Sequence, residues 1–291
     1  MENEEEKWIS EREVILDEWS EVELKSREVI MAANMESPFA SIRAEHSLEE
    51  IMKYLNPDPV QMVVPSTQES GVLEEKTTWE RLLRYCTCRP GTSQIPAAAV
   101  ADKAAINTLA QTNYDDTNPH HWRMLSEYFG EIVQYATETI AVPSQCHRSG
   151  PHWQLVGFQG LNPATDFRGG GVFSLLQMFI TANITPPNVL KFIVALSRSE
   201  PNDFPLAVLS INITGVILKL LNTQKLDSLA TVDGIWQPVC KLHSLALQYF
   251  CEQYKAKSAS LAQCQTILTD LETCISRNPS KFLATTSEIV G

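Results

Sequence analysis

The sequence predicts an all-α protein: a compact multi-helix domain preceded by an acidic, mostly helical extension. From about residue 96 onward, apolar residues recur at helical spacing, and prolines and capping residues mark the ends of these segments. No segment alternates apolar and polar residues for long enough to form a sheet, and no repeat of solenoid period occurs. We expect an N-terminal extension over residues 1–95, a helical domain over 96–278 and a C-terminal tail over 279–291.

The composition is that of an ordinary globular protein with an acidic N-terminal part. Of the 291 residues, 44% are hydrophobic and 20% are charged, and the net charge is −12. Residues 1–80 hold 20 acidic and 7 basic side chains, a net charge of −13, so the remaining chain is close to neutral. Neither part has the basic stripe that nucleic acid binding requires. We therefore expect no nucleic-acid partner.

The N-terminal extension shows weak helical patterning. Residues 2–34 resemble an acidic helix, which is either a partner-binding arm or a solvated helix lying over the domain. A capping box at residues 47–50 begins a short helix, and a second one at 77–80 begins another that runs to about Arg89. Residues 57–76 between them hold three prolines and no periodicity, which predicts a loop.

The helical domain is divided by prolines. Asn118 and Pro119 form an N-cap followed by proline at the first helical position. Asn278 and Pro279 stop the last of the periodic segments. The expected helices span residues 96–111, 119–129, 131–141, 172–180, 187–197, 204–221, 238–250 and 261–275.

The expected location is the cytoplasm. Seven cysteines, an odd number without disulfide or zinc spacing, indicate a reduced protein. The acidic start lacks the apolar segment of a signal peptide. The longest apolar segment, 204–221, contains Pro205, Asn212 and Lys219, whereas a membrane span needs about 20 apolar residues. We therefore expect a buried helix there and no integral membrane span.

One segment, residues 153–178, is unusually dense in residues with special backbone roles. Pro163 fixes its own φ and disfavours a helical conformation at Asn162. Thr165 and Asp166 are good N-cap residues. Three glycines at 169–171 then predict unusual backbone angles or close packing against another segment, and an apolar helix follows. Arg168 should therefore occupy a tight turn before a buried helix, where its five donors can face phosphate oxygens.

This segment resembles the signature of the ELMO domain family. A second, looser similarity covers Phe204–Ala207 and Ser210–Thr214, and the last leucine of the signature is Met178 here. The resemblance covers roughly residues 100–278. The matching signature residues are Trp153, Gly157, Phe158, Gln159, Pro163, Thr165, Asp166, Phe167, Arg168, Gly169, Gly171 and Leu175.

The resemblance implies a role with small GTPases. Short proteins of the ELMOD type are GTPase-activating proteins (GAPs) for Arf-like and Arf GTPases, and the arginine at the position of Arg168 is implicated in catalysis. Long ELMO scaffolds instead pair with DOCK-type exchange factors for Rac and carry additional domains. The intact Thr165–Gly169 motif and the short chain favour a GAP. The alternative is a non-catalytic interaction module in Rac-linked cytoskeletal signalling.

A GAP of this kind needs one arginine delivered in trans and no independent active site. Mg²⁺ and GTP would belong to the partner GTPase, so no cofactor is expected, and the GTPase would recruit the protein to membranes. Structural alternatives remain open: Arg168 caps a helix or pairs with Asp166, and Gln159 holds the loop. The residues expected to contact the GTPase or support the motif are Gln159, Thr165, Asp166, Gly169, Gly171, Trp153 and Phe158.

Other chemistries lack their signatures in this sequence. There is no GxxxxGK[ST] nucleotide-binding loop and no GxSxG elbow of a hydrolase. His120, His121, His147 and His152 lie near Cys146 in the sequence, but their spacing fits no zinc module. We therefore expect no bound metal.

Overall fold

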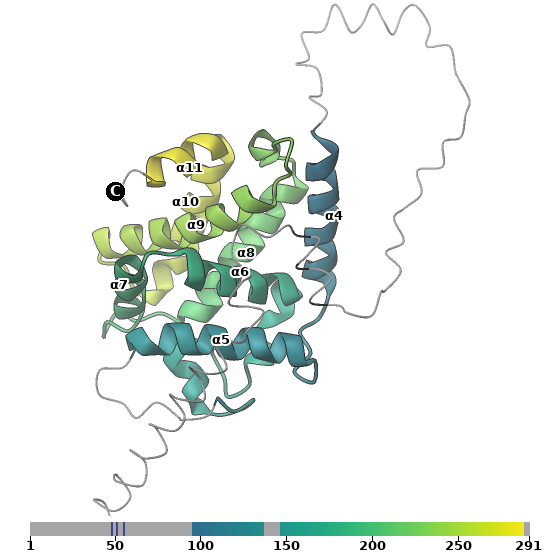
Figure 1. Ribbon diagram of the computed structural model, residues 1–291. Helices are drawn as coiled ribbons and strands as arrows, with labels where there is room; N and C mark the ends of the chain where they lie inside the picture. The colour runs from purple at the N-terminus through teal and green to yellow at the C-terminus, as the bar shows by residue number, and fades with distance from the viewer. Residues whose placement is uncertain (1–47, 49–50, 52–54, 56–94, 137–145, 288–291) are drawn as a thin grey trace, which may run out of the picture.

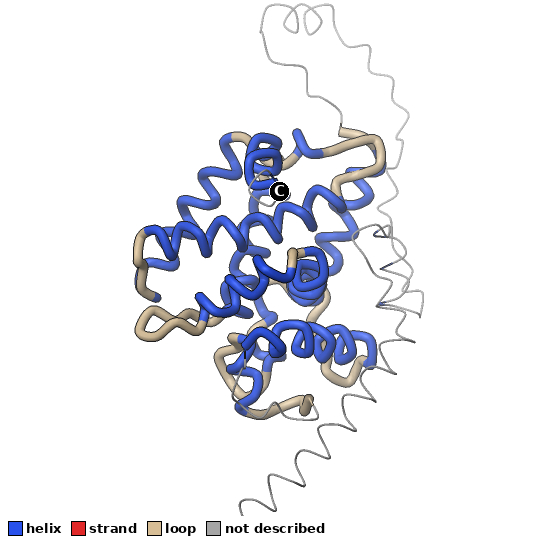
Figure 2. Tube along the Cα trace, turned by 60° about the vertical axis from the view of Figure 1, so that its left-hand side comes forward, coloured by secondary structure: helices blue, strands red, loops and turns tan. Residues whose placement is uncertain are grey.

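The computed structural model describes residues 95–136 and 146–287, together with Leu48, Ile51 and Leu55 (Figure 1). The described residues form helices and connecting loops without a β-strand, as the tube in Figure 2 shows. The nearest approach to a strand pairing among them is an isolated bridge between Thr231 and Gly234. The predicted all-α fold is confirmed for this part of the chain.

The described chain consists of α-helices with short 3₁₀ turns between some of them. The α-helices are α4 (Ala97–Gln111), α5 (Pro119–Ala136), α6 (Gly171–Ile184), α7 (Pro187–Ser197), α8 (Leu206–Asn222), α9 (Trp236–Ala256), α10 (Cys264–Arg277) and α11 (Pro279–Ser287). The 3₁₀ turns are η1 (Pro151–Val156), η2 (Pro163–Thr165), η3 (Phe167–Gly169), η4 (Asp227–Leu229) and η5 (Leu261–Gln263).

Helix α6 is the central element of the domain. It contacts α4, α5, α8 and α9, which surround it in Figure 1. Every residue from Gly171 to Ala182 is buried, so the helix has no polar, solvent-facing side over this length. A mainly apolar helix that is buried on all sides belongs inside a core. The turns η2 and η3 lead directly into its N-terminus, so the core holds the end of the signature segment in place.

Several helix boundaries differ from the sequence-based expectation, among them the C-terminal ends of α6 at Ile184 and of α9 at Ala256. Helix α5 continues through Gly130 to Ala136 as one helix, because Phe129, Ile132 and Val133 are buried along the same face. Helix α9 begins at Trp236 rather than at Pro238. Residues 279–287, assigned above to a tail, form α11, whose Phe282 ring lies 5.5 Å from the ring of Tyr249 on α9.

Most predictions for the N-terminal extension lie outside the described residues, including the acidic helix over 2–34 and the helix from 77 to 89. The described exceptions are Leu48, Ile51 and Leu55, which are helical and buried in the main core with at most 3% of their area exposed. Part of the short helix predicted after the first capping box is therefore packed against the domain. The predicted domain boundaries stay predictions.

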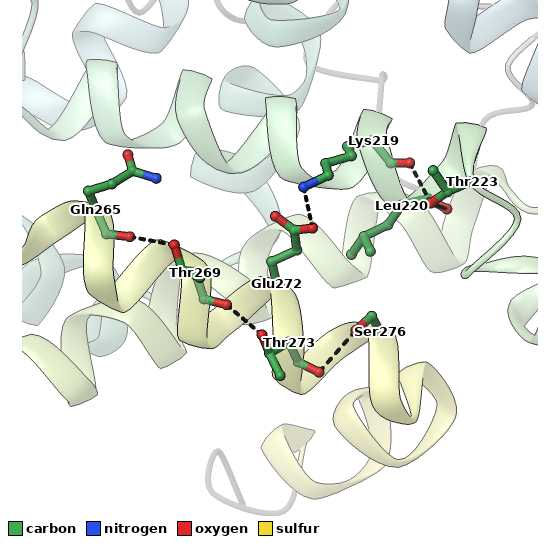
Figure 3. A network of polar contacts seen from close by, with 8 residues as sticks. All are labelled: Lys219, Leu220, Thr223, Gln265, Thr269, Glu272, Thr273 and Ser276. Atoms are coloured by element: carbon green, nitrogen blue, oxygen red, sulfur yellow. Dashed lines mark hydrogen bonds and ion pairs between the residues drawn. The ribbon is translucent and has the colours of Figure 1, made fainter.

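No helix in the described ranges combines the length and hydropathy that a membrane crossing requires. Helix α8, which covers most of the longest apolar segment, is packed between other helices as expected. Its outer edge borders an open groove toward α10. There Lys219 Nζ lies 2.6 Å from Glu272 Oε1, and Thr269 and Thr273 donate to carbonyls one turn earlier in α10 (Figure 3). This groove is polar and is bridged by the ion pair.

Candidate functional site

Arg168 lies on the short turn η3, between a buried and an exposed neighbour. The Phe167 side chain is 3% exposed, and its ring lies 5.1 Å from Tyr114 and 5.8 Å from Phe158. Arg168 and Gly169 are both exposed. The aromatic contacts fix the backbone of the turn to the core, so the position from which the Arg168 side chain projects is well defined.

The turn before it is stabilised by Asn162. Its backbone is extended, with φ −119°, as expected before proline. Its side-chain Oδ1 accepts a hydrogen bond from Ala164 N at 3.0 Å, while its carbonyl accepts from Thr165 Oγ1 at 2.9 Å. Asn162 is therefore the N-cap of η2. The N-cap role predicted for the Thr165 side chain is wrong.

Asp166 closes the loop by a contact with Gln159. Its Oδ2 accepts a hydrogen bond from the Gln159 backbone N at 3.0 Å, and its side chain makes no capping bond to η3. The bond joins two exposed segments seven residues apart. The expected role of Asp166 in holding the turn thus fits a loop-closing contact, not a helix cap.

Within the described part of the chain, Arg168 has no ion pair or hydrogen bond through its side chain. Among these residues, Arg168 therefore neither pairs with Asp166 nor caps a helix end, which were the two structural alternatives. The Gln159 side chain is also exposed. Both side chains face solvent, on a loop whose backbone is held by hydrogen bonds.

Gly171 is required by the backbone where α6 begins. Its φ is +49°, and a Cβ placed there would lie 2.2 Å from the carbonyl oxygen of Thr112. The next residue, Val172, donates its N–H to that same oxygen at 2.9 Å. The close approach docks the start of α6 on the end of α4. At Gly169, by contrast, a Cβ would have no neighbour within 4 Å.

Gly157 makes a second close contact, between the end of η1 and the start of α8. Its φ is +87°, and a Cβ would lie 2.2 Å from Leu206 N. Its carbonyl accepts a hydrogen bond from Val208 N at 3.3 Å. The two segments that carry the family resemblance, around 157–171 and 204–214, therefore meet in space.

Trp153 and Phe158 lie in the core beneath the loop. They are 0% and 2% exposed, and their rings are 5.5 Å apart. Trp153 Nε1 donates to the His147 carbonyl at 3.0 Å. Because both side chains are buried, neither can contact a partner directly. Their burial fits the other expected role, which is to support the motif.

Two residues in the site were missed by the sequence reasoning. The first is Asn162. It precedes Pro163 as Asn118 precedes Pro119, so the same cap rule would have found it. Tyr114 gives no such signal, because it comes from the loop after α4 and reaches Phe167 only through the fold. Burial raises the pKa of Tyr114 above its ordinary value, so the phenol stays neutral.

The histidines near this loop serve as hydrogen-bonding partners. His121 Nδ1 accepts from Asp115 N at 3.2 Å, and His152 Nε2 lies 3.0 Å from the His147 carbonyl. Burial lowers the pKa of both imidazoles. Among residues 95–136 and 146–287 there is no group of three or more His, Cys, Asp or Glu side chains that could hold a metal ion.

Comparison with known proteins places the site in a family. The model of the ELMO/CED-12 family matches residues 104–268, which is more than half of the chain. ELMO domain-containing protein 3 of Mus musculus is 22% identical over 94% of this chain and 68% of its own length. The Homo sapiens protein of that name is 25% identical over 63% of this chain and 47% of its own.

A similar protein is also found in a third organism. ELMO domain-containing protein B of Dictyostelium discoideum is 25% identical over 60% of each chain. No solved structure matches the chain. The family match contains the Arg168 turn, its Asp166–Gln159 closure and the contact between Gly157 and α8. This chain belongs to the ELMO/CED-12 family.

Proposed function

We propose that this chain is a GTPase-activating protein for a small GTPase of the Arf or Arf-like group, and that Arg168 acts on the bound GTP in trans. One observation carries the proposal. Arg168 is exposed, has no ion-pair partner among the described residues, and extends from a turn that is fixed on both sides. An arginine with a purely structural role would be expected to use its donors within the chain.

The reaction requires no other catalytic group from the activating protein. Hydrolysis of GTP spreads negative charge over the γ-phosphoryl oxygens in the transition state, and an arginine supplied in trans stabilises that charge. The planar guanidinium can donate two parallel hydrogen bonds to such oxygens. The GTPase brings GTP, Mg²⁺ and the attacking water, so this chain needs no nucleophile, base or cofactor of its own.

The surrounding residues would act by positioning. Phe167 anchors one side of the turn in the core, and the Asp166–Gln159 bond closes the other side. Gly169 leaves open space beside the arginine. A turn that is ordered before binding does not lose that conformational entropy when the complex forms. Gln159 and Thr165 are exposed on the same loop and would contact the GTPase.

The GTPase group is proposed from the similarity of the Thr165–Gly169 motif to the ELMOD type, since the names of the relatives state only an ELMO domain. A cytoplasmic protein that reaches membranes through its GTPase belongs to the same proposal. The competing proposal is a non-catalytic module that holds a partner in Rac-linked signalling.

Single-turnover GTP hydrolysis on a panel of Arf and Arf-like GTPases tests this function. The wild type should accelerate hydrolysis by at least one of them. Arg168→Ala should lose about 10³-fold of the rate, the lower end of what such an arginine contributes. Arg168→Lys keeps the charge without the planar fork and should lose most of the rate. Arg277→Ala, which removes an exposed arginine at the end of α10, is the matched control and should behave as wild type.

Two results would count against the proposal in different ways. If Arg168→Ala accelerates hydrolysis as well as the folded wild type does, the protein is a GAP through another residue. If no GTPase on the panel responds to the wild type, the non-catalytic module becomes the better reading of the site.

A further inference from the structure

Leu161 lies on the same loop as Arg168 and exposes an apolar side chain. Its exposed fraction is 55%, against 3% or less for Trp153, Phe158 and Phe167 around it. Single exposed leucines are common on protein surfaces and need no explanation by themselves. Leu261 on η5, with 58% exposed, is an example outside this loop. What distinguishes Leu161 is the way its backbone is held and its distance from Arg168.

The backbone at Leu161 is fixed by contacts on both sides. Its carbonyl accepts a hydrogen bond from Gly150 N at 2.8 Å, and Asn162 next to it caps η2. The segment that contains Gly150 is itself anchored, because the guanidinium of Arg148 lies 4.6 Å from the ring centroid of Trp122. An exposed apolar side chain on an ordered backbone loses little entropy when a partner covers it.

Leu161 and Arg168 are close enough to be covered by one partner. The Gln159–Asp166 hydrogen bond joins the loop, and each of the two residues lies two positions from that bond. Two residues span at most about 7 Å, so the two Cα atoms are no more than about 20 Å apart. A standard interface buries about 800 Å² on each partner and is therefore roughly 30 Å wide. An interface of this width can cover both residues when its centre lies between Arg168 and Leu161.

We propose that Leu161 is an apolar anchor for the GTP-loaded small GTPase that receives Arg168, and that it contributes to affinity and not to the chemical step. This inference rests on the proposed function. The partner presents an apolar patch next to its nucleotide site, and burial of Leu161 there adds hydrophobic stabilisation to the polar contacts of Gln159, Thr165 and Arg168. Arg168 then acts on the γ-phosphate of a GTPase that Leu161 helps to hold.

The test separates affinity from rate. Single-turnover hydrolysis is measured with increasing concentrations of the full chain, which gives a half-saturating concentration and a maximal rate. Leu161→Ser should raise the half-saturating concentration roughly tenfold or more, as expected for loss of a buried leucine, with the maximal rate unchanged. Arg168→Ala should lower the maximal rate instead. Leu261→Ser is the matched control for removing an exposed leucine and should change neither value.

Direct binding to the GTPase loaded with a non-hydrolysable GTP analogue completes the test. Leu161→Ser should weaken this binding by the same factor, with an unchanged thermal unfolding midpoint. If the wild type accelerates hydrolysis and Leu161→Ser matches it in both values, the anchor is refuted while the GAP function stands. If the wild type binds without accelerating and Leu161→Ser loses binding, the anchor stands and the GAP function fails. If the wild type neither binds nor accelerates, both are overturned.

Discussion

At the scale of single residues, the site depends on a few backbone contacts that tolerate no substitution. Gly169 and Gly171 of the signature differ in this respect although they lie only two positions apart. Gly171 has a positive φ and meets the Thr112 carbonyl, whereas Gly169 has open space where a side chain would begin. The motif thus combines one glycine that the fold requires with another that leaves the surface beside Arg168 uncovered.

Gly171→Ala should therefore destabilise the protein, while Gly169→Ala should not. A non-glycine residue at positive φ costs about 1–2 kcal/mol, and the overlap with the Thr112 oxygen adds to this. We expect the free energy of unfolding to fall by about 2 kcal/mol or more for Gly171→Ala and to change by less than about 0.5 kcal/mol for Gly169→Ala. Urea unfolding followed by circular dichroism measures both. Equal effects of the two variants would contradict the role given to Gly171.

At the scale of helices, α9 begins where another helix provides its cap. Asp102 on α4 accepts hydrogen bonds through Oδ2 from the backbone N–H groups of Ile235 and Trp236, at 2.7 and 2.9 Å. These N–H groups have no partner within α9, because the first turn of a helix leaves its donors free. The cap lies more than 130 residues away in sequence. The start of α9 is thus determined by the packing of α4.

Removing this cap should loosen the contact between α4 and α9. Asp102→Ala leaves two partly buried N–H groups without an acceptor, which costs about 1–2 kcal/mol of stability. Asp102→Asn keeps an oxygen acceptor and should cost less. Chemical denaturation gives the values, and Asp233→Ala, in the loop before α9 and with an exposed side chain, serves as the control. An Asp102→Ala variant as stable as the control would show that the cap contributes nothing.

At the scale of the whole molecule, the core contains a polar seam where α6, α8 and α9 meet. His243 on α9 is 0% exposed, and its Nε2 lies 3.1 Å from the Ser210 carbonyl while its Nδ1 lies 2.7 Å from Thr181 Oγ1. Because a carbonyl can only accept, Nε2 carries the proton and Nδ1 accepts from the hydroxyl. The neutral imidazole therefore satisfies both neighbours, and burial lowers its pKa to about 4.

Stability should consequently fall on acidification. Between pH 6.5 and 4 the unfolded chain binds a proton at His243 and the folded chain does not, so the free energy of unfolding decreases as the pH falls through this window. From pH 7 to pH 5 this one group should account for a loss of about 2 kcal/mol.

Urea unfolding at pH 7, 6 and 5 measures this loss, with His243→Gln for comparison. His121 and His152, whose pKa values are also lowered by burial, act in the same direction in both proteins and cancel in the comparison. The variant should have a flatter pH dependence, whatever its stability at pH 7. A parallel pH dependence of the two proteins would exclude His243 as the source.

The elements that depend only on neighbours along the chain could be predicted from the amino-acid sequence. The all-α class, the ends of α4 and α7, and the Asn118 cap follow from periodicity, prolines and capping residues. The position of Arg168 at a tight turn before a buried helix follows in the same way. These are local properties, because a side chain that caps or breaks a helix acts within about four residues.

Which distant segments meet depends on how the helices pack, and no local pattern predicts it. Asp102 capping α9, Gly157 against Leu206, and Gly171 against Thr112 join residues that no local pattern relates. The exposure of Arg168 also belongs here, because whether an arginine finds a carboxylate depends on what the fold brings beside it. Similarity to the family signature distinguishes Arg168 from the other arginines of the chain. The packing of α6 and α8 against its turn left that arginine on the surface, without a partner among the described residues.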